Sequence, residues 1–325
     1  MAKQTYDHLK PTHDEFFRFL TESPAVRRDL VGVCFPDLAP ELGALTVMPG
    51  EFSGGKRADL LLSAVDSRGK ADDKSSEHLL YFLLEHKARP ERMVAVQLLS
   101  YAAAILEQHR GPARGRGASP RSPLPRLHIA VLYHGVTPWQ VPERLSALQG
   151  YDGSGTTEPA VELTYKLIDL NQIPLDRQRL SAESMAGFIV MRSVLRRLGT
   201  EQLRLIRDLI FDSGLETHWA VRVLRYLFSY LHAETTQEAL PLFRERQYTH
   251  QQEQIMYSIT DYLIDQGLEK GLEKGQRQAQ INIAKRMLAK GIDVQTVCET
   301  TELSEAEVRS IQQTGDAPQE WSPSR

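Results

Sequence analysis

The sequence HLLYFLLEHKARP, at residues 78–90, contains the strand around which the fold is predicted. Residues 78–84 are mostly apolar, and a short apolar run of this kind is typical of a strand buried in a core. Glu85, His86 and Lys87 follow at once. Because residues two apart in a strand point to the same face, Glu85 and Lys87 are expected to project together, with His86 on the opposite face.

A second apolar run precedes this strand. Residues 58–66, ADLLLSAVD, predict a strand, and the polar connection SRGKADDKSSE predicts an antiparallel hairpin. In such a hairpin the start of the first strand lies beside the end of the second. Asp59 is therefore expected close to Glu85, so that two carboxylates and the ammonium of Lys87 share one end of the sheet.

This trio has a chemical use. Two neighbouring carboxylates repel each other, and burying them without a cation is costly. Mg²⁺ favours one or two carboxylates together with waters and phosphate oxygens, and a bound metal ion polarises a phosphodiester and activates water. Lys87 would hold the attacking water or offset charge that develops on the phosphate. The simpler alternative is an exposed ion pair between Glu85 and Lys87, worth about 0–1 kcal/mol.

The surrounding pattern is that of an α/β protein. Residues 12–35 predict a helix that begins with a capping box of Thr12 and Glu15. Residues 91–109 predict a second helix, in which Met93, Val96 and Leu99 recur at helical spacing. Further strands are expected at residues 127–135 and 161–170, and helices from 185 to about 231. The sequence predicts a first domain over residues 1–240.

The remaining chain, residues 241–315, predicts a helical tail. It contains the repeat GLEKGLEKGQRQ from Gly267, where glycines cost about 1 kcal/mol each in a helix interior and suggest close helix approach. Residues 284–311 predict three short helices: Gly291 ends the first, and Ser304 with Glu307 caps the last. These helices form either a helix-turn-helix or a small packing or dimerisation module. Residues 316–325 are expected to be disordered.

Composition narrows the class of protein. The 325 residues are 41% hydrophobic and 25% charged, which is typical of a soluble globular chain. A net charge of -3 and a pI near 6.4 exclude a global basic field for nucleic acid. Two distant cysteines do not make a disulfide framework, and no stretch resembles a signal peptide or a membrane span. We expect a cytoplasmic protein that does not enter a membrane.

A local basic segment lies between the second helix and the third strand. RGPARGRGASPRSPLPR, at residues 110–126, contains five arginines and no acidic residue. Its many glycines and prolines exclude a regular element. It is either a solvated insertion or an arm in which Arg114, Arg116 and Arg121 contact phosphates.

The combination of Asp59 with Glu85, His86 and Lys87 resembles the D…(D/E)-x-K core of the PD-(D/E)XK nuclease superfamily. More closely, the chain resembles the Rpn family of recombination-promoting nucleases, also described as transposase-like. The resemblance covers most of the chain, through the segments HDEFFRFL, ADLLL, LLEHKARP, QLLSYAAAILEQH, VLYHGVTPW and the EKG repeat. It implies a restriction-endonuclease-like central mixed sheet flanked by helices, with a helical C-terminal extension.

The resemblance also implies site residues. By this match Asp59 and Glu85 hold the metal ion together with the backbone carbonyl of His86, and Lys87 is the catalytic lysine. Ala58 stands where the superfamily often has proline.

Gln97 and Tyr101 match the Q-x-x-x-Y pair of the next helix, which in RecB-type nucleases helps to position the site and the nucleic acid. Glu15 or, failing that, Asp14 matches the acidic residue of the first helix and is a further expected metal ligand.

The expected function is a metal-dependent DNA endonuclease, linked to recombination or mobile-element activity. Its cofactor would be Mg²⁺, with Mn²⁺ as a substitute, and its partners DNA and a second copy bound through the helical tail. One alternative is a catalytically weak or inactive DNA-binding or assembly protein of the same fold, which the acidic pI favours. Another is an RNA-directed nuclease, since the motif carries no information about the sugar.

Overall fold

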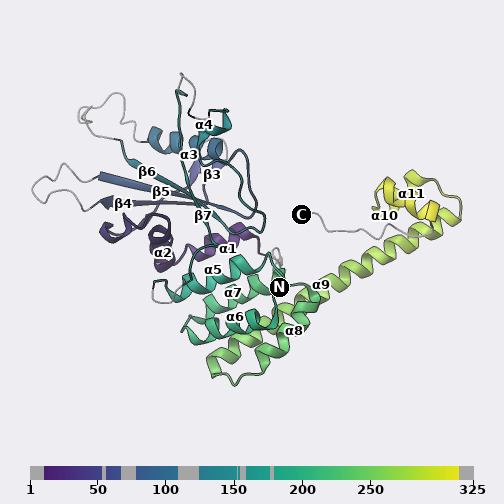
Figure 1. The fold of residues 1–325 in the computed structure, drawn as a ribbon. Helices are drawn as coiled ribbons and strands as arrows, with labels where there is room; N and C mark the ends of the chain where they lie inside the picture. Colours follow the sequence, from purple (N-terminus) through teal and green to yellow (C-terminus); the bar gives the residue numbers. More distant parts are fainter. Residues whose placement is uncertain are drawn as a thin grey trace, which may run out of the picture. The chain divides into compact units, whose positions relative to one another are not determined.

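A five-stranded mixed sheet, in the order β1-β4-β5-β6-β7, forms the centre of the N-terminal part of the chain (Figure 1). The computed structural model describes residues 11–52, 56–66, 78–108, 124–151, 153, 159–175 and 179–314. The chain divides into two units, Met1–Met256 and Tyr257–Arg325. The sheet lies wholly within the first unit.

The predicted hairpin is confirmed. Strands β4 (Leu60–Asp66) and β5 (His78–Lys87) pair antiparallel, with Leu60 opposite Leu84 and Asp66 opposite His78. Residues 80–84 are all buried, which explains why they read as a continuous apolar run. The hairpin therefore brings the beginning of β4 to the end of β5.

Two further strands extend the sheet in parallel. The chain leaves β5, forms helix α3 (Val94–Gln108) and returns as β6 (Arg126–Tyr133), which pairs parallel to β5; β7 (Lys166–Asp169) then pairs parallel to β6. The short strand β1 (Thr46–Val47) pairs with β4 on the other side. The predicted strand 161–170 is shorter than expected, because Leu163 and Tyr165 pair instead with the segment around α4 (Leu145–Leu148).

The two faces of the sheet are covered by different helices. Tyr81 and Leu83 of β5 share a hydrophobic core with Val94 and Leu98 of α3. On the opposite face the ring of Phe82 lies 5.5 Å from that of Phe35, at the end of α2. Figure 1 accordingly shows α3 on one side of the sheet and α1, α2 and α5 on the other. Alternate residues of β5 thus face two separate environments.

The predicted helix 12–35 is wrong in one respect, because it is two helices. Helix α1 (His13–Leu20) begins with the predicted capping box, and α2 (Pro24–Cys34) starts after a break in which Ser23 caps the new helix and Pro24 occupies its first turn. Helix α5 (Ala182–Ser193) packs closely on α1, since a Cβ atom at Gly187 would lie 2.5 Å from Leu20.

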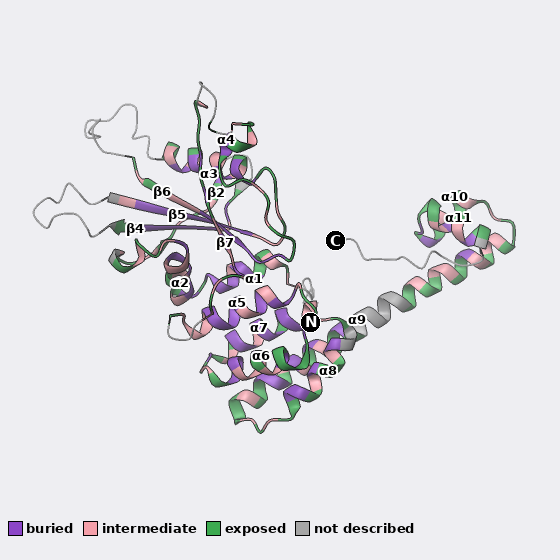
Figure 2. Ribbon diagram, viewed as in Figure 1, coloured by how far each residue is buried: buried purple, intermediate pink, exposed green. Residues whose placement is uncertain are grey.

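The other elements of the first unit are short strands and a set of helices. The buried faces of helices α6 and α7 meet each other and that of α5, as Figure 2 shows. These other elements are η1 (Ala39–Glu41), β2 (Glu51–Phe52), β3 (Lys56–Arg57), α6 (Thr200–Asp212), α7 (Thr217–Tyr230) and α8 (Ala233–Arg244). Helix α9 (His250–Ala289) begins in the first unit and continues into the second. Pro241, where the sequence places the start of the tail, lies inside α8.

The second unit ends in three packed helical segments. The end of α9, α10 (Val294–Thr301) and α11 (Glu305–Thr314) surround a small core, made of Ala284, Val297, Leu303, Val308 and Ile311. Gly291 follows α9 with φ +76°, and Ser304 and Glu307 form the predicted capping box. At Gly267 and Gly275 an added Cβ would meet no described atom within 4 Å, so close helix approach does not occur there within the described chain.

This architecture confirms the predicted fold class: a mixed α/β sheet flanked by helices, of the restriction-endonuclease-like kind, followed by C-terminal helices. In the part of the chain that the structure describes, no helix combines the length and the apolar character needed to cross a bilayer.

Candidate active site

The end of β5 brings the predicted carboxylates together. One register step beyond the pair Leu60–Leu84, Asp59 lies opposite Glu85. Its Oδ2 accepts a hydrogen bond of 2.9 Å from the backbone N–H of His86, which fixes Asp59 to the neighbouring strand. The juxtaposition predicted from hairpin geometry is therefore present.

Glu85 is buried, with 3% of its surface exposed. Its Oε1 lies 3.1 Å from Nζ of Lys87 and accepts a 2.7 Å hydrogen bond from Nε2 of Gln97, whereas its Oε2 has no hydrogen-bond partner among the described residues. Burial, and then the charge of Asp59, raise the pKa of Glu85 to about 7; burial likewise raises the pKa of Asp59. Ionising both groups is unfavourable without a further cation.

Gln97 and Tyr101 connect α3 to this cluster. The Gln97 side chain accepts from Nζ of Lys87 at 3.2 Å and donates to Glu85 and to the hydroxyl of Tyr101 at 2.8 Å. The Tyr101 hydroxyl donates in turn to the backbone carbonyl of Arg57 at 3.0 Å, beside the start of β4. The two residues are one helical turn apart, so α3 presents both to the same face. They link the glutamate, the lysine and the preceding strand in one hydrogen-bonded network.

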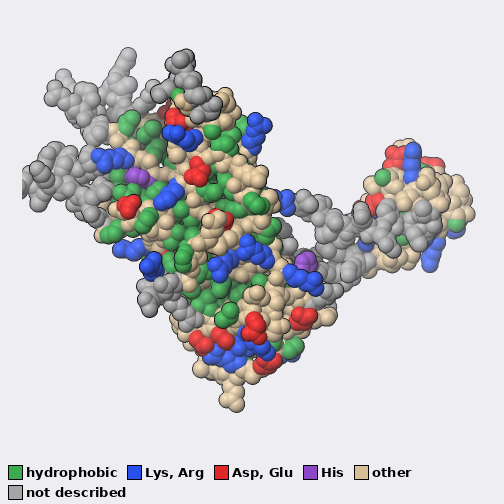
Figure 3. All heavy atoms as spheres, in the orientation of Figure 1, with side chains coloured by type: hydrophobic (Ala, Val, Ile, Leu, Met, Phe, Trp, Pro, Cys, Tyr) green, Lys and Arg blue, Asp and Glu red, His purple; other side chains and the backbone are tan. Residues whose placement is uncertain are grey.

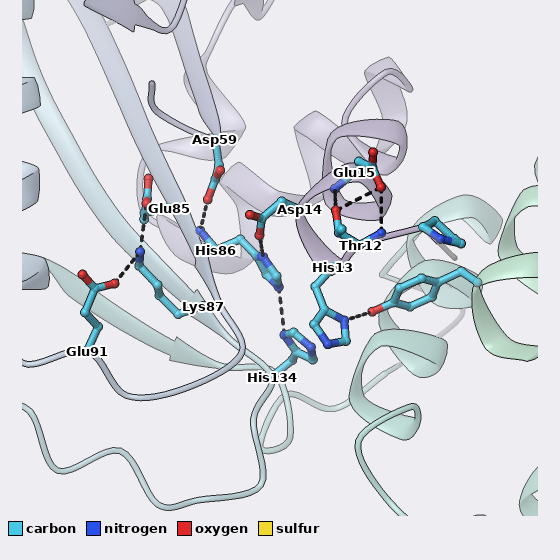
Figure 4. Close-up of polar contacts among 12 residues, drawn as sticks. Thr12, His13, Asp14, Glu15, Asp59, Glu85, His86, Lys87, Glu91 and His134 are labelled. Carbon is cyan, nitrogen blue, oxygen red and sulfur yellow. Dashed lines mark hydrogen bonds and ion pairs between the residues drawn. The ribbon is translucent and has the colours of Figure 1, made fainter. Parts of the chain in front are cut away.

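Lys87 has a partner that sequence reasoning missed. Glu91, in the loop between β5 and α3, places Oε2 2.7 Å from Nζ of Lys87 (Figure 4). Burial lowers the pKa of Lys87, but the carboxylates of Glu85 and Glu91 outweigh that effect and raise it overall. Lys87 is thus held in its charged form. No periodicity links a loop residue to a strand end, so only the spacing of four residues could have suggested this contact.

The opposite face of β5 carries a stack of histidines. His86 is buried against the ring of Phe17 at 5.1 Å, and its Nε2 lies 2.8 Å from Nδ1 of His134. The ring of His134 is 5.1 Å from that of His13, whose Nδ1 lies 2.5 Å from the Tyr226 hydroxyl. Burial lowers the pKa of His134. The sequence did not predict that the side chains of His13, His86 and His134 meet.

The acidic residues of α1 point in different directions. Glu15 turns back to Thr12, where its Oε2 accepts from the backbone N–H at 2.7 Å. Asp14 instead points toward the strand end, with Oδ1 3.4 Å from Nδ1 of His86 (Figure 4). This contact with His86 lowers the pKa of Asp14. Of the two residues named for this position, the structure brings Asp14 to the site and uses Glu15 as a helix cap.

The donor set suits a hard cation. Asp59 and Glu85 offer two carboxylates, and one buried oxygen of Glu85 has no hydrogen-bond partner within the described ranges. Mg²⁺ uses one or two carboxylates with waters and substrate oxygens. In the described residues no group of three or more His, Cys, Asp or Glu side chains is arranged to hold a metal ion. A fully protein-bound metal cage is therefore not what the described chain offers.

Other predicted contacts lie elsewhere. Arg114, Arg116 and Arg121 fall outside the described residues, and Arg126 begins β6. On the face shown in Figure 3, basic and acidic side chains are interspersed rather than gathered in one basic field. A cavity of about 730 Å³ between α2 and the segment after β7 contains none of the candidate site residues.

Comparison with known proteins identifies the family. The model of the family described as "Putative transposase, YhgA-like" matches residues 11–213, and that of the "Rpn/YhgA-like nuclease family, C-terminal HTH domain" matches residues 277–313. The chain belongs to the Rpn/YhgA-like nuclease family. The second match covers the end of α9, α10 and α11, and supports the helix-turn-helix interpretation of the Rpn C-terminal module.

Similar Rpn proteins are found in Escherichia coli. The inactive recombination-promoting nuclease-like protein RpnE of strain K12 is 23% identical over 312 residues, covering 91% of this chain and 96% of RpnE. The recombination-promoting nuclease RpnA of the same strain is 22% identical over 306 residues, covering 93% and 97%. RpnD of strain O157:H7 is 23% identical over 167 residues, covering 50% and 60%. No solved structure matches the chain.

Proposed function

We propose that this protein is a metal-dependent endodeoxyribonuclease whose active site is the end of β5, and that it acts in recombination or mobile-element movement. The observation that carries the proposal is the buried cluster in which Glu85 contacts Lys87 and Gln97 while its Oε2 has no hydrogen-bond partner in the part of the chain that the structure describes. Burying two neighbouring carboxylates, Asp59 and Glu85, costs free energy that Lys87 only partly offsets, and a bound metal ion would remove that cost.

Asp59, Glu85 and the backbone carbonyl of His86 would hold Mg²⁺, with Mn²⁺ as a substitute. When bound, the ion supplies charge stabilisation at the phosphate and lowers the pKa of water. Hydrolysis forms a bond between water oxygen and phosphorus and breaks the bond to the sugar oxygen, which leaves with a proton. Lys87 orients that water or offsets the negative charge that develops on the phosphate.

The neighbouring residues position this chemistry. Gln97 ties Lys87 to Glu85, and Tyr101 ties Gln97 to the strand preceding Asp59. Asp14 takes the place of the acidic residue of the first helix, since its carboxylate faces His86 whereas Glu15 caps α1. The side chains thereby keep the strand end in one geometry before substrate arrives.

DNA is the proposed substrate, and the C-terminal helix-turn-helix module supports it because such modules commonly bind DNA. The arginines 114, 116 and 121 would add phosphate contacts. The helical tail would also join two copies of the chain. Each of these assignments is independent of the hydrolytic site, whose candidate residues all lie at or before Tyr101.

Incubation of the purified protein with supercoiled plasmid tests the proposal. Nicked or linear product is expected with Mg²⁺ or Mn²⁺ and not with EDTA, and Asp59→Ala and Glu85→Ala should abolish it. Circular dichroism establishes that these variants are folded. Equal cleavage by wild type and both variants, or cleavage that persists in EDTA, contradicts the proposal.

A second candidate is a DNA-binding or assembly protein that keeps the fold without hydrolysis. It is favoured by the similarity to RpnE, which is named inactive. The same plasmid assay separates the two candidates, since an inactive protein shifts the mobility of DNA without converting supercoiled plasmid to product.

A further inference from the structure

The ammonium of Lys87 has as many acceptors around it as it has protons to donate. Lysine carries three N–H donors. Among the residues that the structure describes, three oxygens lie within 3.2 Å of Nζ: Oε2 of Glu91 at 2.7 Å, Oε1 of Glu85 at 3.1 Å and Oε1 of Gln97 at 3.2 Å. A substrate oxygen or a water that binds Nζ must therefore displace one of them.

The three acceptors differ in how easily they can leave. The Glu85 side chain is 4% exposed and is also bonded to Gln97. Gln97 is fixed by its two further hydrogen bonds, to Glu85 and Tyr101. The Glu91 side chain is 47% exposed and belongs to the loop between β5 and α3. Of the three acceptors, the Glu91 carboxylate is the one that reaches solvent, so it is hydrated at once when it is released.

We propose that Glu91 is a displaceable stand-in for a phosphate oxygen of the substrate. Its carboxylate occupies the position on Lys87 that an anionic phosphodiester oxygen takes, and nucleic-acid binding exchanges one anion for the other. The inference rests on the proposed function, since it names the ligand that Lys87 receives there. In the free protein Glu91 holds Lys87 in place. An anion that binds Lys87 more weakly than Glu91 does cannot displace it.

Two consequences follow from this exchange. Because Glu91 competes with the phosphodiester for Nζ, removing its charge should tighten the binding of DNA. Because the competition is for Lys87, that effect should vanish when Lys87 is removed. Simple repulsion between Glu91 and the DNA backbone predicts the first result but not the second, so a double-mutant cycle separates the two explanations.

The experiment measures the affinity of the full chain for a short fluorescent DNA duplex by anisotropy, at fixed ionic strength, in EDTA and again in Ca²⁺. The variants are Glu91→Gln, Lys87→Met and the double variant. Glu107→Gln is the matched control: it removes the same charge from an exposed site on α3, nearly three helical turns beyond Gln97. Thermal melting establishes that all variants are folded.

Glu91→Gln is expected to bind the duplex about three- to tenfold more tightly than wild type. The same change in the Lys87→Met background, and Glu107→Gln, should alter affinity less than about twofold. Unchanged or weaker binding by Glu91→Gln, or equal tightening in both backgrounds, overturns the inference. A wild-type protein that shows this pattern of binding but never cleaves plasmid refutes the nuclease proposal alone, and absence of all duplex binding refutes both.

Discussion

Charged side chains are buried and crowded at the end of β5, whereas an ion pair along α11 of the C-terminal unit lies at the surface. Glu85 is 3% exposed, and the carboxylates of Glu85 and Glu91 both contact Lys87. In the C-terminal unit, Glu305 and Arg309 pair on α11 with both side chains 64% exposed. Residues 277–290 contain four basic and no acidic residues, whereas residues 293–313 contain five acidic residues and one arginine.

Burial decides whether a charged side chain is informative about function. An exposed pair contributes about 0–1 kcal/mol and costs little to keep, so the charges of α11 are compatible with any soluble helix. A buried cluster costs several kcal/mol per ion unless it is well paired. The strand end retains that cost, together with an oxygen that has no hydrogen-bond partner among the described residues, which is what the proposed ligand site would require.

The largest effect is expected at Lys87. Lys87→Ala should reduce plasmid cleavage by about 10²- to 10⁴-fold, because it removes the group that orients water or stabilises charge on the phosphate. Mg²⁺-dependent stabilisation of the folded protein should survive, since the carboxylates remain. Gel quantification of plasmid conversion measures the loss. Plasmid cleavage by this variant at the wild-type rate would mean that the buried charge of Lys87 matters no more for function than the exposed charges of α11.

The next effect concerns stability and pH in EDTA. Burial and then Asp59 raise the pKa of Glu85 from 4.5 to about 7. Between these values the folded protein keeps a proton that the unfolded chain has released, so this group makes stability fall as the pH rises. The Glu85→Gln side chain does not titrate. Its free energy of unfolding should therefore rise relative to that of the wild type across that interval, by about 3 kcal/mol at most. Chemical denaturation at a series of pH values measures the difference in free energy of unfolding between the variant and the wild type. A difference that does not change with pH contradicts the raised pKa of Glu85.

Removing the C-terminal unit should have a smaller effect, and that effect should be on the affinity for DNA. A chain that ends at Met256 keeps every candidate site residue and the contacts of early α9 with Phe211. Its affinity for DNA should fall about tenfold, roughly 1.4 kcal/mol, while Mg²⁺-dependent cleavage at saturating DNA persists. Complete loss of cleavage by a truncated chain with native circular dichroism would show that the two regions do not divide the work in this way.

The smallest effect per residue is expected in the arginine segment. If Arg114, Arg116 and Arg121 contact phosphates, replacing each with Gln should lower the slope of log affinity against log salt by about 0.9 on duplex DNA. Titrations at several salt concentrations measure that slope. A slope that does not change assigns residues 110–126 to a solvated insertion.

The elements that are set by local periodicity could be predicted from the sequence. The period of two in β5 put Glu85 and Lys87 on one face, and hairpin geometry brought Asp59 beside them. The break between α1 and α2 was missed although Ser23 and Pro24 are a helix-start signal. The buried face of α3 was not evident because apolar residues occur on several sides of the helix: Val96 is exposed, as is Met93 just before the helix, while Ala95 and Leu98 are buried.

The contacts that depend on tertiary packing could not be predicted. Asp14 rather than Glu15 faces the strand end because the capping box turns Glu15 toward Thr12, a choice that becomes visible only when α1 is docked on the sheet. Glu91 reaches Lys87 from a loop without periodicity. His134 lies 48 residues after His86 in the sequence, and the two meet because β6 runs parallel to β5. Each case joins residues whose spacing carries no local signal.

The most direct test is the melting temperature with and without Mg²⁺. Binding to the folded state raises the melting temperature by mass action, so wild type and Lys87→Ala should both be stabilised as Mg²⁺ is titrated in. Asp59→Ala and Glu85→Ala should not respond, and in EDTA each should melt at or above the wild-type temperature. If Mg²⁺ stabilises the two carboxylate variants as much as the wild type, the end of β5 is not a metal site.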